Sequence, residues 1–76
     1  MREYAREKGL LTEREIDVLR LVARGYSSQN VAKELCIATN TVHVHRQNIM
    51  KKLNIHKASG LTWYALKNGI IKIRRV

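Results

Sequence analysis

The spacing of aliphatic residues is the feature of this sequence that most restricts its fold. Ile, Leu and Val recur three and four positions apart along most of the chain, and the alternation typical of strands is nearly absent. The chain also contains no proline, the residue that most strongly breaks a helix. These patterns predict an all-α fold of four helices, at residues 13–24, 28–35, 40–53 and 58–68.

Local signals mark the ends of the predicted helices. Thr12 is placed to cap the first helix, and Glu15, three residues later, completes a capping box. Leu11 and Ile16 flank this cap as a hydrophobic staple. Further caps are expected at Ser27 and Thr39, and helix ends are expected at Gly25, Asn54 and Gly69, which tolerate a left-handed backbone.

Each predicted helix has an apolar stripe that we expect to face a shared core. The stripes of the first two helices are Ile16, Leu19, Val22 and Ala23, and then Val31, Ala32 and Leu35. Those of the third and fourth helices are Val42, Ile49 and Leu53, and then Ala58, Leu61 and Ala65. The tail with Ile70, Ile71 and Ile73 either packs on this core or frays.

The length of the chain, 76 residues, suits one domain with a modest core. We expect this domain to occupy residues 11–76, preceded by a linker or N-terminal arm at residues 1–10. The lone Cys36 cannot form an internal disulfide, and no apolar run approaches the roughly 20 residues of a membrane helix. No signal-peptide pattern opens the chain. These features predict a soluble, cytoplasmic protein that has no membrane partner.

Charge is distributed very unevenly along the chain. Fifteen Lys and Arg residues against six acids give a formal charge of +9. All six acids lie within the first 34 residues, while residues 35–76 hold eight basic residues and no acid. Such a field attracts a polyanion and favours a nucleic acid as partner. Ribosome-associated and membrane-surface proteins are also basic, so charge alone leaves these classes open.

The second and third predicted helices are separated by only about three residues, 36–38. A connection this short fits a helix-turn-helix unit, although any helical hairpin in a small bundle shares it. Ala32 provides a small side chain where the two helices approach each other, and Ile37 and Val42 are expected to fill their junction.

The third predicted helix carries the functional prediction. Val42, Ile49 and Leu53 stack on its core side, and the opposite side collects polar residues around Val44. The helix has no carboxylate, whereas an ordinary solvated helix usually mixes both charge signs. Amides and cations can pair with base edges, and an exposed Val can contact a thymine methyl group. This face therefore predicts major-groove recognition of duplex DNA.

Phosphate contacts are expected from residues that border this face or open a helix, where free N–H groups attract anions. Arg46 lies at the edge of the core side, where its stem can cover apolar atoms while its head reaches a phosphate. His45 leans inward and is expected to be structural or to contact phosphate. The full predicted phosphate set is Ser28, Gln29, Asn30, Thr39, Asn40, Thr41, Arg46, Asn48, Lys51 and Lys52.

Other chemistries find no support in the sequence. His43 and His45 are about 200° apart on a helix and cannot share a metal ion there, and Cys36 is the only thiol. With no phosphate-binding glycine loop and no catalytic set, we expect neither an enzyme nor a cofactor. On the fourth helix, Trp63 and Tyr64 point away from the predicted core, as a possible dimer surface or as cover for the edge of the domain.

A series of motif residues extends along nearly the whole chain. It comprises LTERE at residues 11–15, Val18, Leu19, Ala23, Gly25, Ser27, Val31, Ala32 and Leu35, then Thr41, Val42, His45, Asn48, Ile49, Lys52 and Leu53, and finally GII at 69–71. Together these residues resemble the LuxR-type (GerE-like) helix-turn-helix family, found in NarL/FixJ response regulators and quorum-sensing regulators. The resemblance covers residues 11–71.

The resemblance implies a four-helix domain with its third helix in the major groove and its fourth available for dimerisation. It places base contacts at His43, Val44 and Gln47, on the face that the helical periodicity also turns outward. His43 stands where many members carry a basic residue, which would make this contact weaker or sensitive to pH.

We therefore expect a sequence-specific DNA-binding domain of a bacterial transcription regulator, either the effector part of a longer protein or a free-standing one. Duplex DNA is the expected partner, with a homodimer through the fourth helix, and RNA polymerase stays open as a further partner. Two other classes remain open: a protein-interaction module that no longer binds DNA, and a domain that binds RNA or the ribosome.

Overall fold

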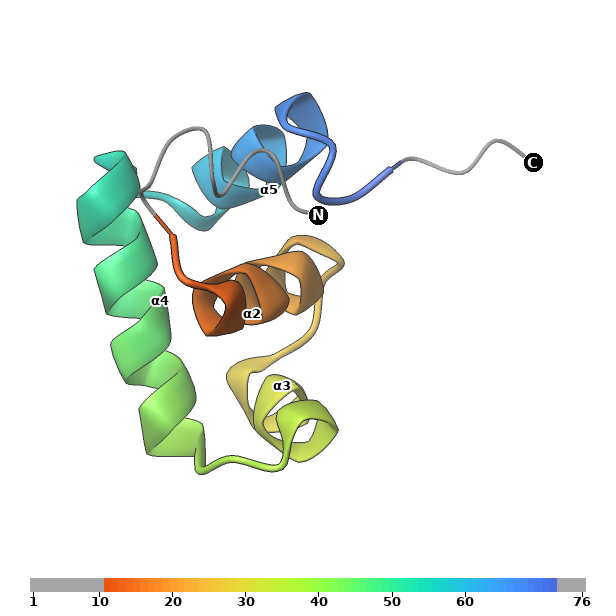
Figure 1. Cartoon of the computed structure of the whole chain (residues 1–76), viewed down its shortest axis with the longest axis vertical. Coiled ribbons are helices and arrows are strands. Elements are labelled where there is room, and N and C mark those ends of the chain that lie inside the picture. Colours follow the sequence, from red (N-terminus) through yellow and green to blue (C-terminus); the bar gives the residue numbers. More distant parts are fainter. Residues whose placement is uncertain (1–10, 73–76) are drawn as a thin grey trace.

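The structure, a computed structural model, describes residues 11–72. This part of the chain contains four helices and no strand (Figure 1). They are α2 (Glu13–Ala23), α3 (Ser28–Leu35), α4 (Thr39–Leu53) and α5 (Ala58–Lys67). The all-α prediction is confirmed, and each boundary lies within one residue of its predicted place. The linker or arm expected at residues 1–10, and Ile73 in the tail, lie outside the described residues.

Side chains cap the first two helices as the sequence predicts. The backbone N–H of Glu15 donates to Thr12 Oγ1 at 3.1 Å, and the backbone N–H of Thr12 donates to Glu15 Oε1 at 2.9 Å. This is the complete capping box. Ser27 caps α3 by accepting a 3.1 Å hydrogen bond from the backbone N–H of Asn30.

The cap predicted for the third helix is wrong. Thr39 is already the first helical residue of α4, and the N-cap is Ala38, which has an extended backbone and no side-chain hydrogen bond. The Ala38 carbonyl instead accepts backbone bonds from Thr41 and Val42, at 3.0 and 3.2 Å. Helix α4 thus begins with backbone hydrogen bonds alone, because alanine has no oxygen to offer.

All four helices end in the same way. In each, one residue adopts a positive φ, and the N–H of the following residue donates to a carbonyl five positions back, as in a Schellman motif. The positive-φ residues are Gly25, Cys36, Asn54 and Gly69, and the residues after them are Tyr26, Ile37, Ile55 and Ile70. Three of these ends were predicted, but nothing in the residue type marked Cys36, whose φ is 58°.

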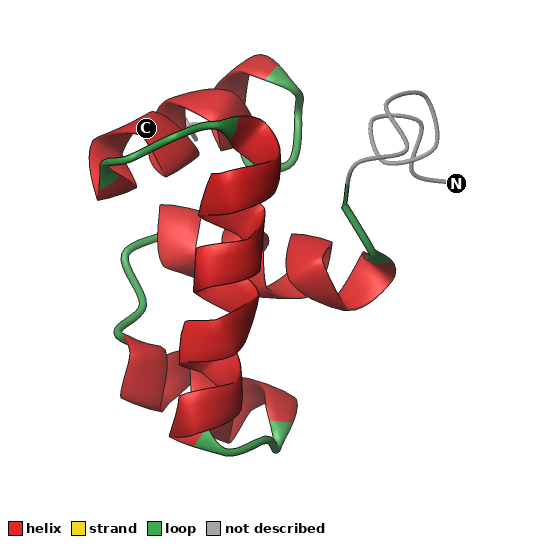
Figure 2. Cartoon of the chain, turned by 90° about the vertical axis from the view of Figure 1, so that its left-hand side faces the viewer, coloured by secondary structure: helices red, strands yellow, loops and turns green. Residues whose placement is uncertain are grey.

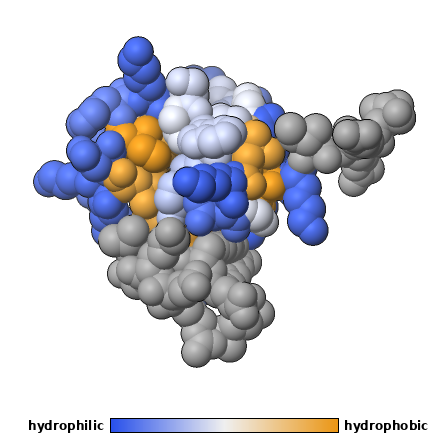
Figure 3. All heavy atoms as spheres, turned by 90° about the horizontal axis from the view of Figure 1, so that it is seen from above, coloured by the Kyte–Doolittle hydropathy of each residue, from blue (hydrophilic) through white to orange (hydrophobic). Residues whose placement is uncertain are grey.

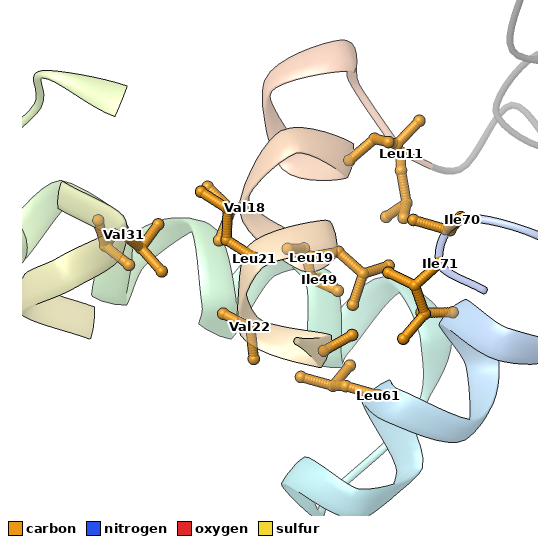
Figure 4. Close-up of a cluster of buried hydrophobic side chains, with 14 of the residues drawn as sticks. Leu11, Val18, Leu19, Leu21, Val22, Val31, Ile49, Leu61, Ile70 and Ile71 are labelled. Carbon is orange, nitrogen blue, oxygen red and sulfur yellow. The ribbon is translucent and has the colours of Figure 1, made fainter. Parts of the chain in front are cut away.

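Helix α2 lies at the centre of the core. Figure 4 shows its aliphatic side chains meeting Val31 of α3, Ile49 of α4 and Leu61 of α5. The predicted stripes of α2 and α3 and most of the other two are buried or half-buried. Ala58 is the exception, since it is exposed at the first residue of α5 and no other helix covers it. Burying a side chain such as Leu or Ile stabilises the fold by about 1.5–3 kcal/mol.

The segment after α5 packs back on the core. Ile70 and Ile71 are buried near Leu11 (Figure 4), and Arg20 Nε of α2 donates to the carbonyl of Ile70 at 3.4 Å. The alternative of a tail frayed from Ile70 onward is therefore wrong for the described part of the segment.

Helix α4 lies along one side of the molecule, with α2 and α3 packed behind it. Seen from that side, α4 runs down the front of the molecule with nothing drawn over its outer face (Figure 2). No helix in residues 11–72 has the length and apolar character needed to cross a bilayer.

Candidate nucleic-acid interface

The outer face of α4 is open to solvent along its length. Val42 and Ile49 are fully buried beneath it, while Val44, on the opposite side, is 48% exposed. The other predicted members of this outward row are exposed as well: Asn40, His43, Gln47, Asn48 and Lys51. The helical periodicity that separated the core side of α4 from its polar side is thus confirmed.

Two half-buried residues, His45 and Arg46, border this face. Arg46 Nη1 donates to Ser28 Oγ at 3.2 Å, across the junction of α4 and α3. The guanidinium of Arg46 is therefore held beside the first residue of α3. A cation at that place adds to the positive end of the α3 dipole, and both favour an anion there.

Several of the remaining predicted phosphate-binding residues lie in the first turns of α3 and α4. Gln29 and Asn30 are exposed in the first turn of α3, and Thr41 is exposed in the first turn of α4, where Thr39 is half-buried. The backbone N–H of Asn30 is already used by the Ser27 cap. The side chain of Asn30 is exposed and is not part of that hydrogen bond. The structure thus leaves polar side chains accessible in the first turns of both helices of the motif.

Lys52 has a partner that the sequence did not reveal. Its Nζ lies 2.8 Å from Oε1 of Glu15, the carboxylate of the capping box, which is only 3% exposed. Burial of that carboxyl opposes its ionisation. The hydrogen bonds from Lys52 and from the Thr12 backbone, with the charges of Lys52 and His45, outweigh burial and hold the pKa of Glu15 below its usual value.

The two lysines that end α4 therefore differ in their surroundings. Lys51 is exposed on the outer face, beside an open depression that is also lined by Gln47, Met50, Ile55 and His56. His56, exposed just after α4, was not predicted as a site residue because it lies outside the helical repeat.

The acidic side chains of the described residues are confined to two helices. Every carboxylate of the described residues lies on α2 or α3, and α4 and α5 have none. Among these acids, Glu15 and Asp17 are paired with basic side chains. The outer face of α4 therefore presents polar and basic groups with no acid of its own to repel phosphate.

The two residues predicted to form a dimer surface, Trp63 and Tyr64, differ in their exposure. Trp63 on α5 is 66% exposed, whereas Tyr64 is half-buried and packs against the core, and burial raises its pKa. Viewed from the α5 end (Figure 3), hydrophobic atoms form two areas separated by a band of intermediate hydropathy. Trp63 is the most exposed of the large hydrophobic side chains in the described chain.

Metal-binding clusters are not found among residues 11–72, where no three His, Cys, Asp or Glu side chains come close enough to hold an ion. Cys36 is exposed at the turn between α3 and α4, where it adopts the left-handed backbone that ends α3.

Comparison with known proteins gives the family. Residues 9–65 match the family described as bacterial regulatory proteins, luxR family. Oxygen regulatory protein NreC of Staphylococcus carnosus is 37% identical over 62 residues, which are 82% of this chain and 29% of that protein. Transcriptional regulatory protein DegU of Brevibacillus brevis is 36% identical over 72 residues, or 95% of this chain and 30% of that protein.

Transcriptional regulatory protein MctR of Rhizobium johnstonii is 44% identical over 61 residues, which are 80% of this chain and 28% of that protein. The chain thus spans about three tenths of the length of these relatives. Since the family match covers most of the chain and the four helices have the expected arrangement, this chain belongs to the luxR family of bacterial regulatory proteins and contains its helix-turn-helix DNA-binding domain.

Proposed function

We propose that this domain recognises a specific duplex-DNA sequence by placing the outer face of α4 in the major groove. His43, Val44 and Gln47 contact the bases in this proposal. The observation that carries it is the exposure of this acid-free face above a fully buried Val42 and Ile49. The groove is wide enough for an α-helix, and its base edges offer a distinct pattern for every base pair.

Each of the three side chains has a defined chemistry for base contact. The Gln47 amide both donates and accepts, which suits the N6 and N7 atoms of adenine. The half-exposed Val44 suits the methyl group of thymine, because it can bury apolar atoms there without stranding a polar one. The His43 imidazole can donate to a guanine acceptor.

Phosphate contacts fix the docking position in this proposal. Arg46, already held at the start of α3 by Ser28, supplies a charged contact, and Lys51 supplies another from the end of α4. Polar groups of α3 and α4 complete the set: Ser28, Gln29, Asn30, Thr39, Asn40, Thr41 and Asn48. Lys52 stands apart from this set, because its ammonium is paired with Glu15.

Selection from a random-duplex library at physiological salt tests the proposal. We expect one enriched sequence motif, bound at least about a thousandfold more tightly than unrelated duplex. A library with no enriched motif after several rounds of selection would overturn the proposal. So would a preference for structured RNA over duplex DNA in competition.

At the scale of the whole protein, we propose that this domain is the DNA-binding part of a transcription regulator of the bacterial cytoplasm and has no catalytic activity. The names of the relatives DegU and MctR describe them as transcriptional regulatory proteins. Homodimerisation through α5 and contact with RNA polymerase belong to this proposal, with Trp63 as the centre of the dimer surface.

A further inference from the structure

Two adjacent lysines at the end of α4 are in different environments. Lys51 is exposed on the proposed DNA face, and its side-chain ammonium has no hydrogen bond or ion pair in the described structure. Lys52 is rotated about 100° from it around the helix and reaches back to α2, where its ammonium contacts the Glu15 carboxylate at 2.8 Å. The Lys52 side chain is 38% exposed, while that of Glu15 is 4% exposed.

Glu15 ties this ion pair to the start of α2. One of its oxygens, Oε1, accepts both the Thr12 backbone N–H and the Lys52 ammonium. If the Lys52 ammonium moved away from Glu15 to contact a phosphate, the buried carboxylate would keep only the hydrogen bond from Thr12. Leaving a buried charge without its partner is unfavourable. The pair also joins residues 37 positions apart, across the packed faces of α2 and α4.

We infer that Lys52 is a positioning residue for DNA recognition and does not contact a phosphate. Its bond to the α2 cap fixes the rotation of the last turns of α4, and this sets the direction in which Gln47 and Lys51 face the groove. The inference rests on the proposed function, since it concerns how the same face is presented to DNA.

Counterion release separates a positioning lysine from a phosphate-binding one. Each phosphate neutralised by a protein cation steepens the dependence of log K on log salt by about 0.9 for duplex DNA. The Lys52 ammonium is held by Glu15 and neutralises no phosphate, so Lys52 adds nothing to that slope. A positioning role instead affects the ratio of specific to non-specific affinity, because only the specific complex needs an exact orientation of α4.

The test compares Lys51→Ala with Lys52→Met in the 76-residue chain, on the selected duplex and on an unrelated one, over a range of salt. For Lys51→Ala we expect a slope lower by about 0.9 and equal weakening on both duplexes. For Lys52→Met we expect an unchanged slope and about tenfold weaker binding to the selected duplex alone. A slope that falls for Lys52→Met as it does for Lys51→Ala would overturn the inference.

Glu15→Gln provides a second, independent test that keeps Lys52. Without the carboxylate, the Lys52 ammonium is free to reach DNA, so the slope is expected to steepen by up to about 0.9. An unchanged slope for Glu15→Gln, together with a slope that falls for Lys52→Met, would show that Lys52 already contacts a phosphate and would overturn the inference. Circular dichroism establishes that each variant is folded, and Lys52→Arg, which keeps the pair, should restore most of the lost selectivity.

The outcomes also distinguish this inference from the proposed function. If the wild-type chain prefers no sequence, both fail. If it binds a selected duplex and Lys52→Met loses affinity equally for both duplexes, the positioning role alone is overturned. A variant that unfolds more easily but keeps its full selectivity when folded would show that the pair only stabilises the domain.

Discussion

At the scale of single residues, the side chains on and beside the outer face of α4 divide into those that are exposed there and those that are held by another helix. Val44, Gln47 and Lys51 are exposed, while Arg46 and Lys52 are held by α3 and α2. A basic side chain near DNA is therefore not automatically a phosphate contact. Its existing partner decides how much charge it can offer.

Gln47→Ala is the direct test of base recognition. If the amide makes a bidentate contact, its loss should weaken binding to the selected duplex by about 1–3 kcal/mol and relax the preference at one base pair. Asn68→Ala, at the far end of α5, is a matched amide control. Repeating the library selection with the variant measures the preference, and an unchanged motif would remove Gln47 from the recognition set.

The pH dependence of stability follows from Glu15. Its pKa is lower in the folded domain than in the unfolded chain, so its ion pair stabilises the fold at neutral pH. This contribution is lost as the pH falls from about 4.3, the ordinary value, through the folded-state pKa. Urea unfolding of the wild type and Glu15→Gln should show a gap of about 1 kcal/mol at pH 7 that narrows below pH 4. A gap independent of pH would contradict this origin.

At the scale of helices, the four elements share one ending but differ in how they begin. All end with a positive-φ residue and a hydrogen bond reaching five residues back. Side chains cap α2 and α3, whereas α4 and α5 begin at Ala38 and Lys57 without a side-chain cap. The beginning of α4 is therefore the weaker end of the helix that carries the proposed function.

A serine at position 38 should strengthen that beginning. Ala38 has φ −72° and ψ 147°, close to the Ser27 cap at −71° and 162°, so a Ser oxygen there can accept from a free N–H of the first turn. We expect Ala38→Ser to stabilise the domain by about 1 kcal/mol and to raise Tm by about 4–8 °C, measured by thermal unfolding. Thr39→Ala is the control. If Thr39→Ala lowers the free energy of unfolding by as much as the loss of a helix cap, about 1 kcal/mol, then Thr39 is the cap of α4.

At the scale of the whole molecule, α2 is the central helix, and α4 and α5 present two different surfaces around it. The α4 surface is polar and basic, and α5 exposes Trp63. A dimer formed through α5 would place two copies of α4 in half-sites about one helical turn apart. The selected DNA should then contain a repeated half-site with that spacing.

Trp63→Ala tests this arrangement without disturbing the core, since the side chain is 66% exposed. We expect cooperative binding to the two half-sites to fall by about tenfold or more, because buried tryptophans often dominate interfaces. Binding to a single half-site should not change. Sedimentation of the complex and titration of both duplexes measure this, with the exposed Ser59→Ala as control. Equal cooperativity in all three proteins would exclude Trp63 from the dimer surface.

The sequence alone determined where the helices lie and which side of α4 faces outward. Caps, stops and helical repeats involve residues three or four positions apart, so their hydrogen bonds and apolar stripes are visible in a linear pattern. This explains why the Thr12 capping box, the end at Asn54 and the exposure of Val44 were predicted. Thr39 was misplaced because a threonine can cap a helix or begin it, and the backbone decides between the two.

Only the tertiary structure decided which polar side chains remain available. Lys51 and Lys52 are neighbours in the sequence, yet one faces solvent and the other meets a carboxylate 37 residues away. Likewise, Ala58 was expected inside and is exposed, because no helix packs over the start of α5. Such outcomes depend on how separate helices pack, and no spacing along one helix contains that information.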